Sequence, residues 1–167
     1  HVEVRQGSGL KVLSPGEADC IAIAGMGAST IISILEDEME VAQSAKLLVL
    51  QPMAGAASLR AWLCSHGWQL AAEELVDDAP HFYEIIAAKR GLAPVYSAAE
   101  CAVGPLLLAQ KHPLLGKQLE RQLATCRQLL ENMGRSERAR ASEKYKEIEA
   151  LKAELEVLQN GKRSDSK

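Results

Sequence analysis

The residues best suited to chemistry in this 167-residue chain are glycines and one glutamine that follow apolar runs. Ala24-Gly25-Met26-Gly27 and Gln51-Pro52 come directly after such runs, and Gly7-Ser8-Gly9-Leu10 follows a short run at the start of the chain. Glycine at the end of a strand allows the backbone to approach a flat ligand closely. Because ligands of open α/β sheets bind at the carboxyl ends of the strands, these segments predict one binding site built of backbone groups and an amide.

Each segment also has a purely structural interpretation. Gly7 and Gly9 would simply turn the chain, since a lone Gly-x-Gly is weak evidence for a site. Gln51-Pro52 would simply end a strand. Gly25 and Gly27 are more informative, and the expected alignment of all three segments on one sheet edge favours a site.

Motifs for hydrolytic, phosphoryl-transfer and metal chemistry are absent from the sequence. It has no nucleophile elbow with a Ser-His-Asp order, no GxxxxGK[ST] loop and no HExxH pair. His66, His81 and His112 are dispersed, so we expect surface or packing roles for them and no metal site. The cysteines form no CxxC pair and are expected to be free buried thiols: Cys20, Cys64, Cys101 and Cys126.

Residues 1–90 alternate apolar runs with amphipathic stretches, which predicts βα units on a largely parallel sheet. Residues 2–4 have strand composition. Residues 21–24 and 47–50 are continuously apolar, as in central strands covered on both faces. Between them we expect a helix capped by Ser29 or Thr30, and residues 56–66 form a second helix that stops at Gly67. The first helix should turn four side chains toward the sheet: Ile31, Ile32, Ile34 and Leu35.

The pattern changes at residue 68. Residues 68–76 and 81–88 are two strand-like runs whose connection is too short for a crossover helix, so they predict an antiparallel hairpin. Class I methyltransferases close their sheet in this way, whereas dinucleotide-binding dehydrogenases usually stay parallel there.

Helix formers dominate from about residue 97. Two series of apolar residues with heptad-like spacing, from Leu119 to Met133 and from Tyr145 to Leu158, predict an antiparallel coiled-coil hairpin. We therefore expect a partial Rossmann-like α/β domain over residues 1–92, a helical domain over 93–160 and a disordered tail over 161–167.

Charge is distributed unevenly behind a net value of −3. Residues 111–146 carry nine basic against four acidic side chains, while residues 1–110 carry an excess of seven acidic ones. Such a basic stretch is either a solvated coiled-coil exterior or a surface for phosphate. Six of its residues are candidates for binding RNA: Arg121, Arg127, Arg135, Arg138, Arg140 and Lys144.

The composition limits the remaining possibilities. A hydrophobic content of 47% is enough for one real core, so the chain is not disordered. No run reaches the roughly 18 apolar residues of a membrane span. We expect a cytoplasmic protein that is a monomer rather than an oligomer. His1 in place of Met suggests that the natural start is missing.

Four segments together carry a family resemblance: Ile21-Ala22-Ile23-Ala24-Gly25-Met26-Gly27, Leu48-Val49-Leu50-Gln51-Pro52, Leu59-Arg60-Ala61-Trp62-Leu63 and Tyr83-Glu84-Ile85-Ile86. With them the chain resembles the bacterial tRNA (adenine-N1)-methyltransferase family of the TrmK type, over most of residues 1–133. The family uses S-adenosylmethionine to methylate the adenine at position 22 of tRNA.

The resemblance implies a role for each candidate segment. Gly7, Ser8, Gly9 and Leu10 would lie beside the adenine of the cofactor. Ala24, Gly25, Met26 and Gly27 would line the methyl-transfer site, and Gln51 and Pro52 would form part of the pocket for the target base. The catalytic candidates are thus Gly25, Met26, Gln51 and Pro52, and the helical hairpin would hold tRNA.

Departures from the family pattern qualify these roles. Ser8 and Met53 stand where the family commonly has Asn, and Ala28 where it has a third glycine. The family's cofactor-binding glycine motif and the acidic residue after its second strand are not in this chain, so we expect it to be inactive alone, with no useful affinity for S-adenosylmethionine. The alternatives are a non-catalytic protein-interaction module and a methyltransferase with a substrate other than tRNA.

Overall fold

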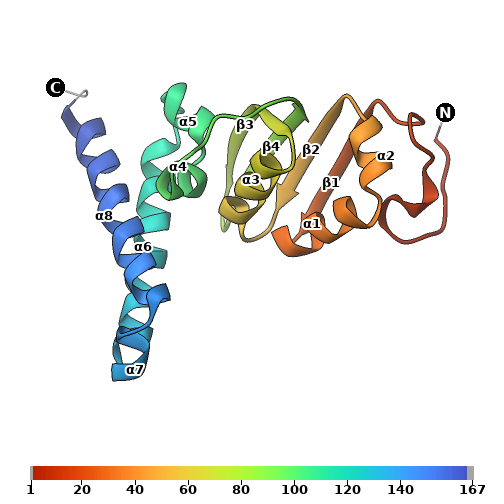
Figure 1. The fold of residues 1–167 in the computed structure, drawn as a ribbon. Coiled ribbons are helices and arrows are strands. Elements are labelled where there is room, and N and C mark those ends of the chain that lie inside the picture. The colour runs from red at the N-terminus through yellow and green to blue at the C-terminus, as the bar shows by residue number, and fades with distance from the viewer. Residues whose placement is uncertain (1, 165–167) are drawn as a thin grey trace. The chain divides into compact units, whose positions relative to one another are not determined.

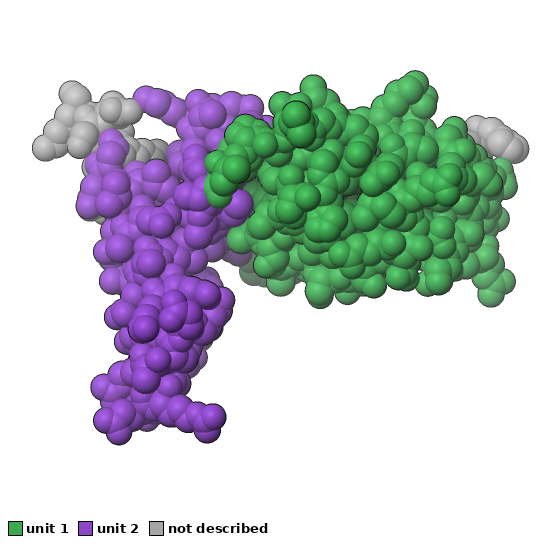
Figure 2. Space-filling view, in the orientation of Figure 1, with its two compact units in different colours: residues 1–96 green, residues 97–167 purple. Residues whose placement is uncertain are grey.

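The computed structural model describes residues 2–164 of the chain. The chain divides into two compact units, residues 1–96 and 97–167, which are coloured separately in Figure 2. The boundary between the two units falls after Tyr96. In the described part of the chain, no helix is long and apolar enough to cross a membrane.

The first unit is built on a four-stranded sheet (Figure 1). Its strands are β1 (Cys20–Met26), β2 (Leu47–Pro52), β3 (Trp68–Asp78) and β4 (His81–Arg90), in the spatial order β1-β2-β4-β3. β1 and β2 are parallel, and β4 lies antiparallel between β2 and β3. The structure thus confirms a parallel sheet that ends in an antiparallel hairpin.

Helices cover one face of this sheet. α1 (Ala28–Asp37) and α3 (Ala56–Ser65) pack against each other and against the strands, and α2 (Met39–Ser44) follows α1 directly (Figure 1). Alternation along each strand places one set of side chains under the helices. The residues buried at this interface are chiefly aliphatic: Ile31, Leu35, Leu48, Leu50, Leu59, Leu63 and Ile86.

The opposite face of the sheet is more open. β1 is the edge strand of the described sheet, and its Ala22 and Ala24 are exposed. The prediction that residues 21–24 lie in the buried middle of the sheet is therefore wrong for this structure, because β1 has a neighbouring strand on one side and covering helices on one face. Residues 2–4 form no strand either, since no adjacent strand completes their backbone hydrogen bonds.

The start of α1 also differs from the prediction. Gly27, in an extended conformation, precedes the helix, and neither Ser29 nor Thr30 caps it. The backbone carbonyl of Ala54 accepts a hydrogen bond from Ala28 N–H at 2.9 Å, so the loop after β2 replaces a side-chain cap. Ile32 and Ile34 are only partly buried, and Glu38 separates α1 from α2.

The second unit is entirely helical. α4 (Ala98–Val103) and α5 (Pro105–Ala109) precede the long α6 (Leu115–Gly134), the short α7 (Glu137–Arg140) and the long α8 (Glu143–Ser164). α6 and α8 pack along each other as the predicted antiparallel hairpin (Figure 1). Their shared core comes from both apolar series: Leu119, Leu123, Cys126, Ile148 and Leu155.

Two smaller expectations are corrected. Residues 161–164 continue α8 instead of beginning a disordered tail, and residues 165–167 lie outside the described residues. None of the four cysteines forms a disulfide, but only Cys101 and Cys126 are buried; Cys20 is exposed and Cys64 is partly exposed. Cys20 begins the edge strand, which explains its exposure.

Candidate functional site

The ends of β1 and β2 form the most unusual backbone of the first unit. The β1–β2 register shifts between Ala24 and Met26, which leaves Gly25 as the extra residue of a bulge. Gly25 has φ +77°, a conformation that side chains rarely adopt, and no atom lies within 4 Å of the place a Cβ would occupy. The backbone at Gly25 is therefore open to a ligand.

The side chain of Gln51 joins the two strand ends. Its Oε1 accepts a hydrogen bond from Gly25 N–H at 2.8 Å. The N–H of the bulge residue, which has no partner in the β1–β2 register, is therefore satisfied by a side chain. Its Nε2 lies 3.5 Å from the sulfur of Met53. One amide thus connects the bulge of β1 with the residue after β2.

Backbone contacts hold the two loops together. Met53 N–H donates to the carbonyl of Met26 at 2.8 Å. Gly55 has φ +77°, and a Cβ there would stand 3.1 Å from the Cβ of Ala28, so glycine allows the loop to pass close to α1. The structure therefore brings Ala24–Gly27 and Gln51–Pro52 together, as their places after parallel strands predict.

The surface of this junction carries few ionisable groups. Met26 is 41% exposed and Met53 is 56% exposed, whereas Pro52 is buried. Thioether, amide and backbone groups are thus what the junction offers to a ligand. No group of three or more His, Cys, Asp or Glu side chains suited to a metal ion occurs among the described residues.

Tyr83 lies at the end of the sheet where β1 and β2 have their carboxyl ends. The β2–β4 register pairs Val49 with Ala87, so alternation places Tyr83 on the same face as Gln51, further toward the carboxyl end of β2. Its ring stacks on His81 with centroids 5.8 Å apart. The other dispersed histidines also have local partners, His66 stacking on Trp62 and His112 accepting from Leu114 N–H.

The turn over Gly7–Leu10 is less closely connected to these strand ends. Gly9 begins a 3₁₀ turn, Gly9–Val12, and a Cβ there would lie 3.2 Å from Ile34 of α1. Leu10 is buried. Within residues 2–164 no hydrogen bond joins this turn to Gly25 or Gln51. The structure thus places the third predicted segment against α1.

A buried ion cluster that sequence reasoning missed supports the loop after β2. Arg60 of α3 has no exposed surface; its Nε donates to Glu73 of β3 at 2.5 Å and its Nη2 to Glu84 of β4 at 2.8 Å. Burial acts to lower the pKa of Arg60, but the two carboxylates outweigh it and hold this pKa above its ordinary value. Because α3 begins at Ala56, the cluster anchors the helix that follows the Met53–Gly55 loop.

The signal for this cluster was present in the sequence. Arg60 lies between Leu59 and Leu63 on the buried stripe of α3, and Glu73 interrupts the apolar residues of β3. A charged residue on a buried stripe requires a partner of opposite charge. Which carboxylate meets it depends on the pairing of β3 with β4.

The basic candidates occupy the hairpin of the second unit and are all exposed. Arg121 and Arg127 belong to α6, and Arg135 follows it. Arg138 and Arg140 lie in the last turn of α7, and Lys144 is the second residue of α8. Arg135 and Lys144 pair with acidic neighbours on the surface, at 3.7 Å and 3.3 Å. Arg127, Arg138 and Arg140 form no ion pair with any described residue.

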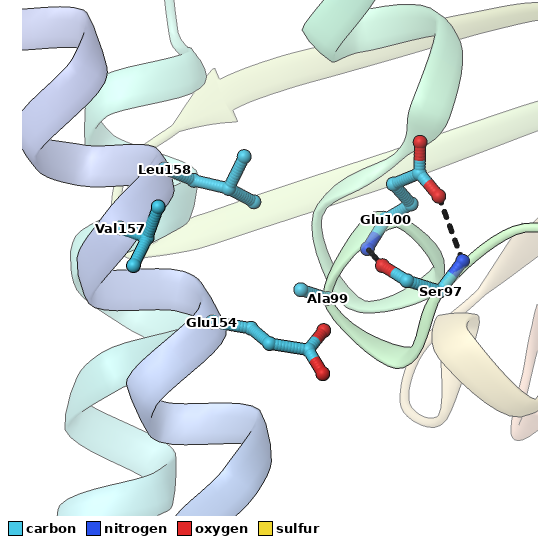
Figure 3. Close-up of a pocket in the computed structure, with 6 residues that line it drawn as sticks. All are labelled: Ser97, Ala99, Glu100, Glu154, Val157 and Leu158. Atoms are coloured by element: carbon cyan, nitrogen blue, oxygen red, sulfur yellow. Dashed lines mark hydrogen bonds between the residues drawn. The ribbon is translucent and has the colours of Figure 1, made fainter.

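A pocket of about 300 Å³ lies elsewhere in the second unit, between α4 and α8 (Figure 3). Ser97 and Glu100 use their polar atoms in a capping box at the start of α4, as the dashed lines show. Val157 and Leu158 add apolar surface and Glu154 adds a carboxylate. A carboxylate repels phosphate, so this hollow is poorly suited to RNA.

Solved structures define the class of protein. A Streptococcus agalactiae protein of the NADB-Rossmann superfamily matches with a TM-score of 0.79 and 26% identity, covering 94% of this chain and 67% of that one. The fold is that of a Rossmann-like methyltransferase, with the last strand inserted antiparallel.

The family model described as tRNA (adenine(22)-N(1))-methyltransferase, TrmK, matches residues 1–160. The Bacillus subtilis enzyme of that name is 31% identical over 163 residues, which cover 95% of this chain and 68% of the relative. This chain belongs to the tRNA (adenine(22)-N(1))-methyltransferase family.

Two crystal structures support the assignment. B. subtilis TrmK has a TM-score of 0.81 and 30% identity, covering 95% of this chain and 70% of that one. A proposed tRNA (m1A22) methyltransferase of Streptococcus pneumoniae, in complex with S-adenosyl-L-methionine, has a TM-score of 0.76 and 26% identity, covering 94% and 68%. S-adenosylmethionine is the methyl donor of this family.

Proposed function

We propose that the intact protein methylates N1 of adenine 22 in tRNA at the junction of β1 and β2. The observation that carries the location is the Gln51–Gly25 hydrogen bond, which fixes an open glycine backbone beside an amide at the carboxyl edge of the sheet. That edge is where open α/β sheets bind ligands. Family membership supports the reaction, and this geometry supports the choice of residues.

The residues at the junction fit the chemical demand. S-adenosylmethionine supplies an electrophilic methyl group on a sulfonium sulfur. The lone pair of neutral adenine N1 forms the new N–CH₃ bond as the S–CH₃ bond breaks and its electron pair returns to sulfur. The product carries the positive charge that sulfur loses, so the transfer is complete without the removal of a proton. Alignment contributes more than deprotonation to such a reaction, so a site without a general base suffices.

Each residue has a task in this proposal. Ala24–Gly27 line the space between the methyl donor and the target base, and the open backbone of Gly25 leaves room for both. Gln51 and Pro52 bound the base pocket, while Met26 or Tyr83 stacks on the base. Gly7–Leu10 lie on the side of the cofactor adenine. An adenine in folded tRNA must first leave its stack to reach this pocket.

The second unit is proposed to hold the tRNA. Arg127, Arg138 and Arg140 are exposed and unpaired among the described residues, so their charges are available to phosphates. The rival interpretation, a protein partner on the apolar seams, finds no support, because Leu119 is 1% exposed and already packed within the hairpin. We further propose a monomer in the cytoplasm, where tRNA is modified.

Mass spectrometry of tRNA tests the function. Nucleosides from cells with and without the gene are compared, and the digest is mapped to locate the modified position. We expect 1-methyladenosine at position 22 to disappear without the gene and to return with it. Unchanged 1-methyladenosine at that position would contradict the proposal.

A further inference from the structure

The hydrogen bonds of Gln51 settle the orientation of its amide. Gly25 N–H is a donor, so the Gln51 atom 2.8 Å away from it must be the carbonyl oxygen. The NH₂ group therefore points away from the bulge, toward the sulfur of Met53 at 3.5 Å. A thioether is a weak acceptor, so the amino group of Gln51 is the end that remains for a ligand.

We infer that Gln51 donates a hydrogen bond to a ring nitrogen of the target adenine other than N1, namely N3 or N7. This inference rests on the proposed function. N1 must keep its lone pair for the methyl group, and the N6 amino group is itself a donor that an NH₂ group cannot pair with. The acceptors left on adenine are N7 and N3, on its two opposite edges.

The consequence is a role in orientation. A bond to N3 or N7 fixes the rotation of the base in its own plane, which turns N1 toward the methyl donor. Guanine also carries N3 and N7, so Gln51 sets the pose of a purine and leaves the choice between adenine and guanine to other groups. The Gly25 bulge serves this role by keeping the oxygen of Gln51 turned inward.

A single substitution separates the two ends of the amide. Gln51→Glu retains an oxygen to accept from Gly25 N–H but removes every donor of the side chain. Gln51→Met removes both functions at similar length. Gln43→Glu makes the same charge change at an exposed position of α2 and serves as the matched control.

The test measures kcat/KM of the full gene product on tRNA that carries adenine, 7-deazaadenine or 3-deazaadenine at the target position. For each base, the kcat/KM of the unsubstituted protein is divided by the kcat/KM of Gln51→Glu. Changes in the intrinsic reactivity of N1 between the bases cancel in this ratio. One neutral hydrogen bond predicts a ratio of about tenfold with adenine. The ratio should fall to near one with the analogue that lacks the bonded nitrogen and stay near tenfold with the other.

Contrary outcomes are distinguishable. Equal ratios with all three bases, or a ratio of one with adenine, would overturn the inference while methylation itself continues. Absence of methylation by the unsubstituted protein would instead remove the function on which it rests. Gln51→Met should resemble Gln51→Glu on adenine, and Gln43→Glu should give a ratio of one throughout; a loss in the control would mean that charge alone explains the effect.

Discussion

Arg60 provides the sharpest test of how the first unit is held together. Arg60→Met would leave Glu73, whose side chain is fully buried, and Glu84, which is 16% exposed, without their shared cation. Breaking a buried ion pair by removing one partner costs about 3–5 kcal/mol, because a charge remains uncompensated in a medium of low dielectric. Since whole domains are stable by only about 5–15 kcal/mol, this loss would bring the unit close to unfolding.

Urea unfolding followed by tryptophan fluorescence measures this loss. Both tryptophans, Trp62 and Trp68, lie in the first unit, so the signal reports on that unit alone. Lys46→Met is the matched control, because its ion pair with Asp19 at 3.1 Å is exposed and should contribute almost nothing. A loss of less than about 1 kcal/mol for Arg60→Met would refute the reasoning.

A compensated variant separates charge from packing. If Arg60→Met is combined with Glu73→Leu and Glu84→Gln, the buried charges disappear together and most of the stability should return. Failure of this triple variant to recover would mean that the shape of the arginine side chain, rather than the unpaired carboxylates, accounts for the loss.

Three further predictions follow from local features. Gly55→Ala should destabilise the first unit by about 1–2 kcal/mol in urea unfolding, because the alanine would adopt a left-handed conformation; no change would mean that the loop relaxes freely. Arg138→Glu with Arg140→Glu should weaken tRNA binding and flatten its dependence on salt in filter-binding assays, and unchanged affinity would favour a solvated surface. Burial raises the pKa of the Cys126 thiol, so at pH 8 a disulfide reagent should modify exposed Cys20 before Cys126, and equal rates of modification would contradict this. The stability that the neutral Cys126 thiol contributes should also decline as pH rises through that raised pKa.

The fold was predictable where periodicity is strong. Continuous apolar runs located β1 and β2, and the short connection before His81 identified the antiparallel hairpin. Heptad-like spacing located α6 and α8. The caps were less predictable: a sequence search for a side-chain cap at Ser29 overlooks a carbonyl such as that of Ala54, which comes from a distant loop.

The candidate site was predictable as a set of segments but not as a geometry. Glycines after strands pointed to Gly25 and Gln51 because parallel strands end at one edge. Their hydrogen bond depends on the bulge at Gly25, which the local sequence pattern does not predict. The support of the loop by Arg60 was missed for a similar reason, since its partners are contributed by two strands that are distant in sequence.

The sequence by itself determined which strands and helices form and which segments come at the carboxyl ends of the strands, because these follow from local composition and spacing. It also carried the family resemblance that the comparisons confirm. Only the tertiary structure decided the direction in which the Gln51 amide points, the exposure of β1 and the partners of Arg60. These three features depend on contacts between segments far apart in the chain. Such contacts cannot be inferred from the types and spacing of neighbouring residues. Ala24–Gly27 and Gln51–Pro52 thus come together as one site only through the pairing of β1 with β2.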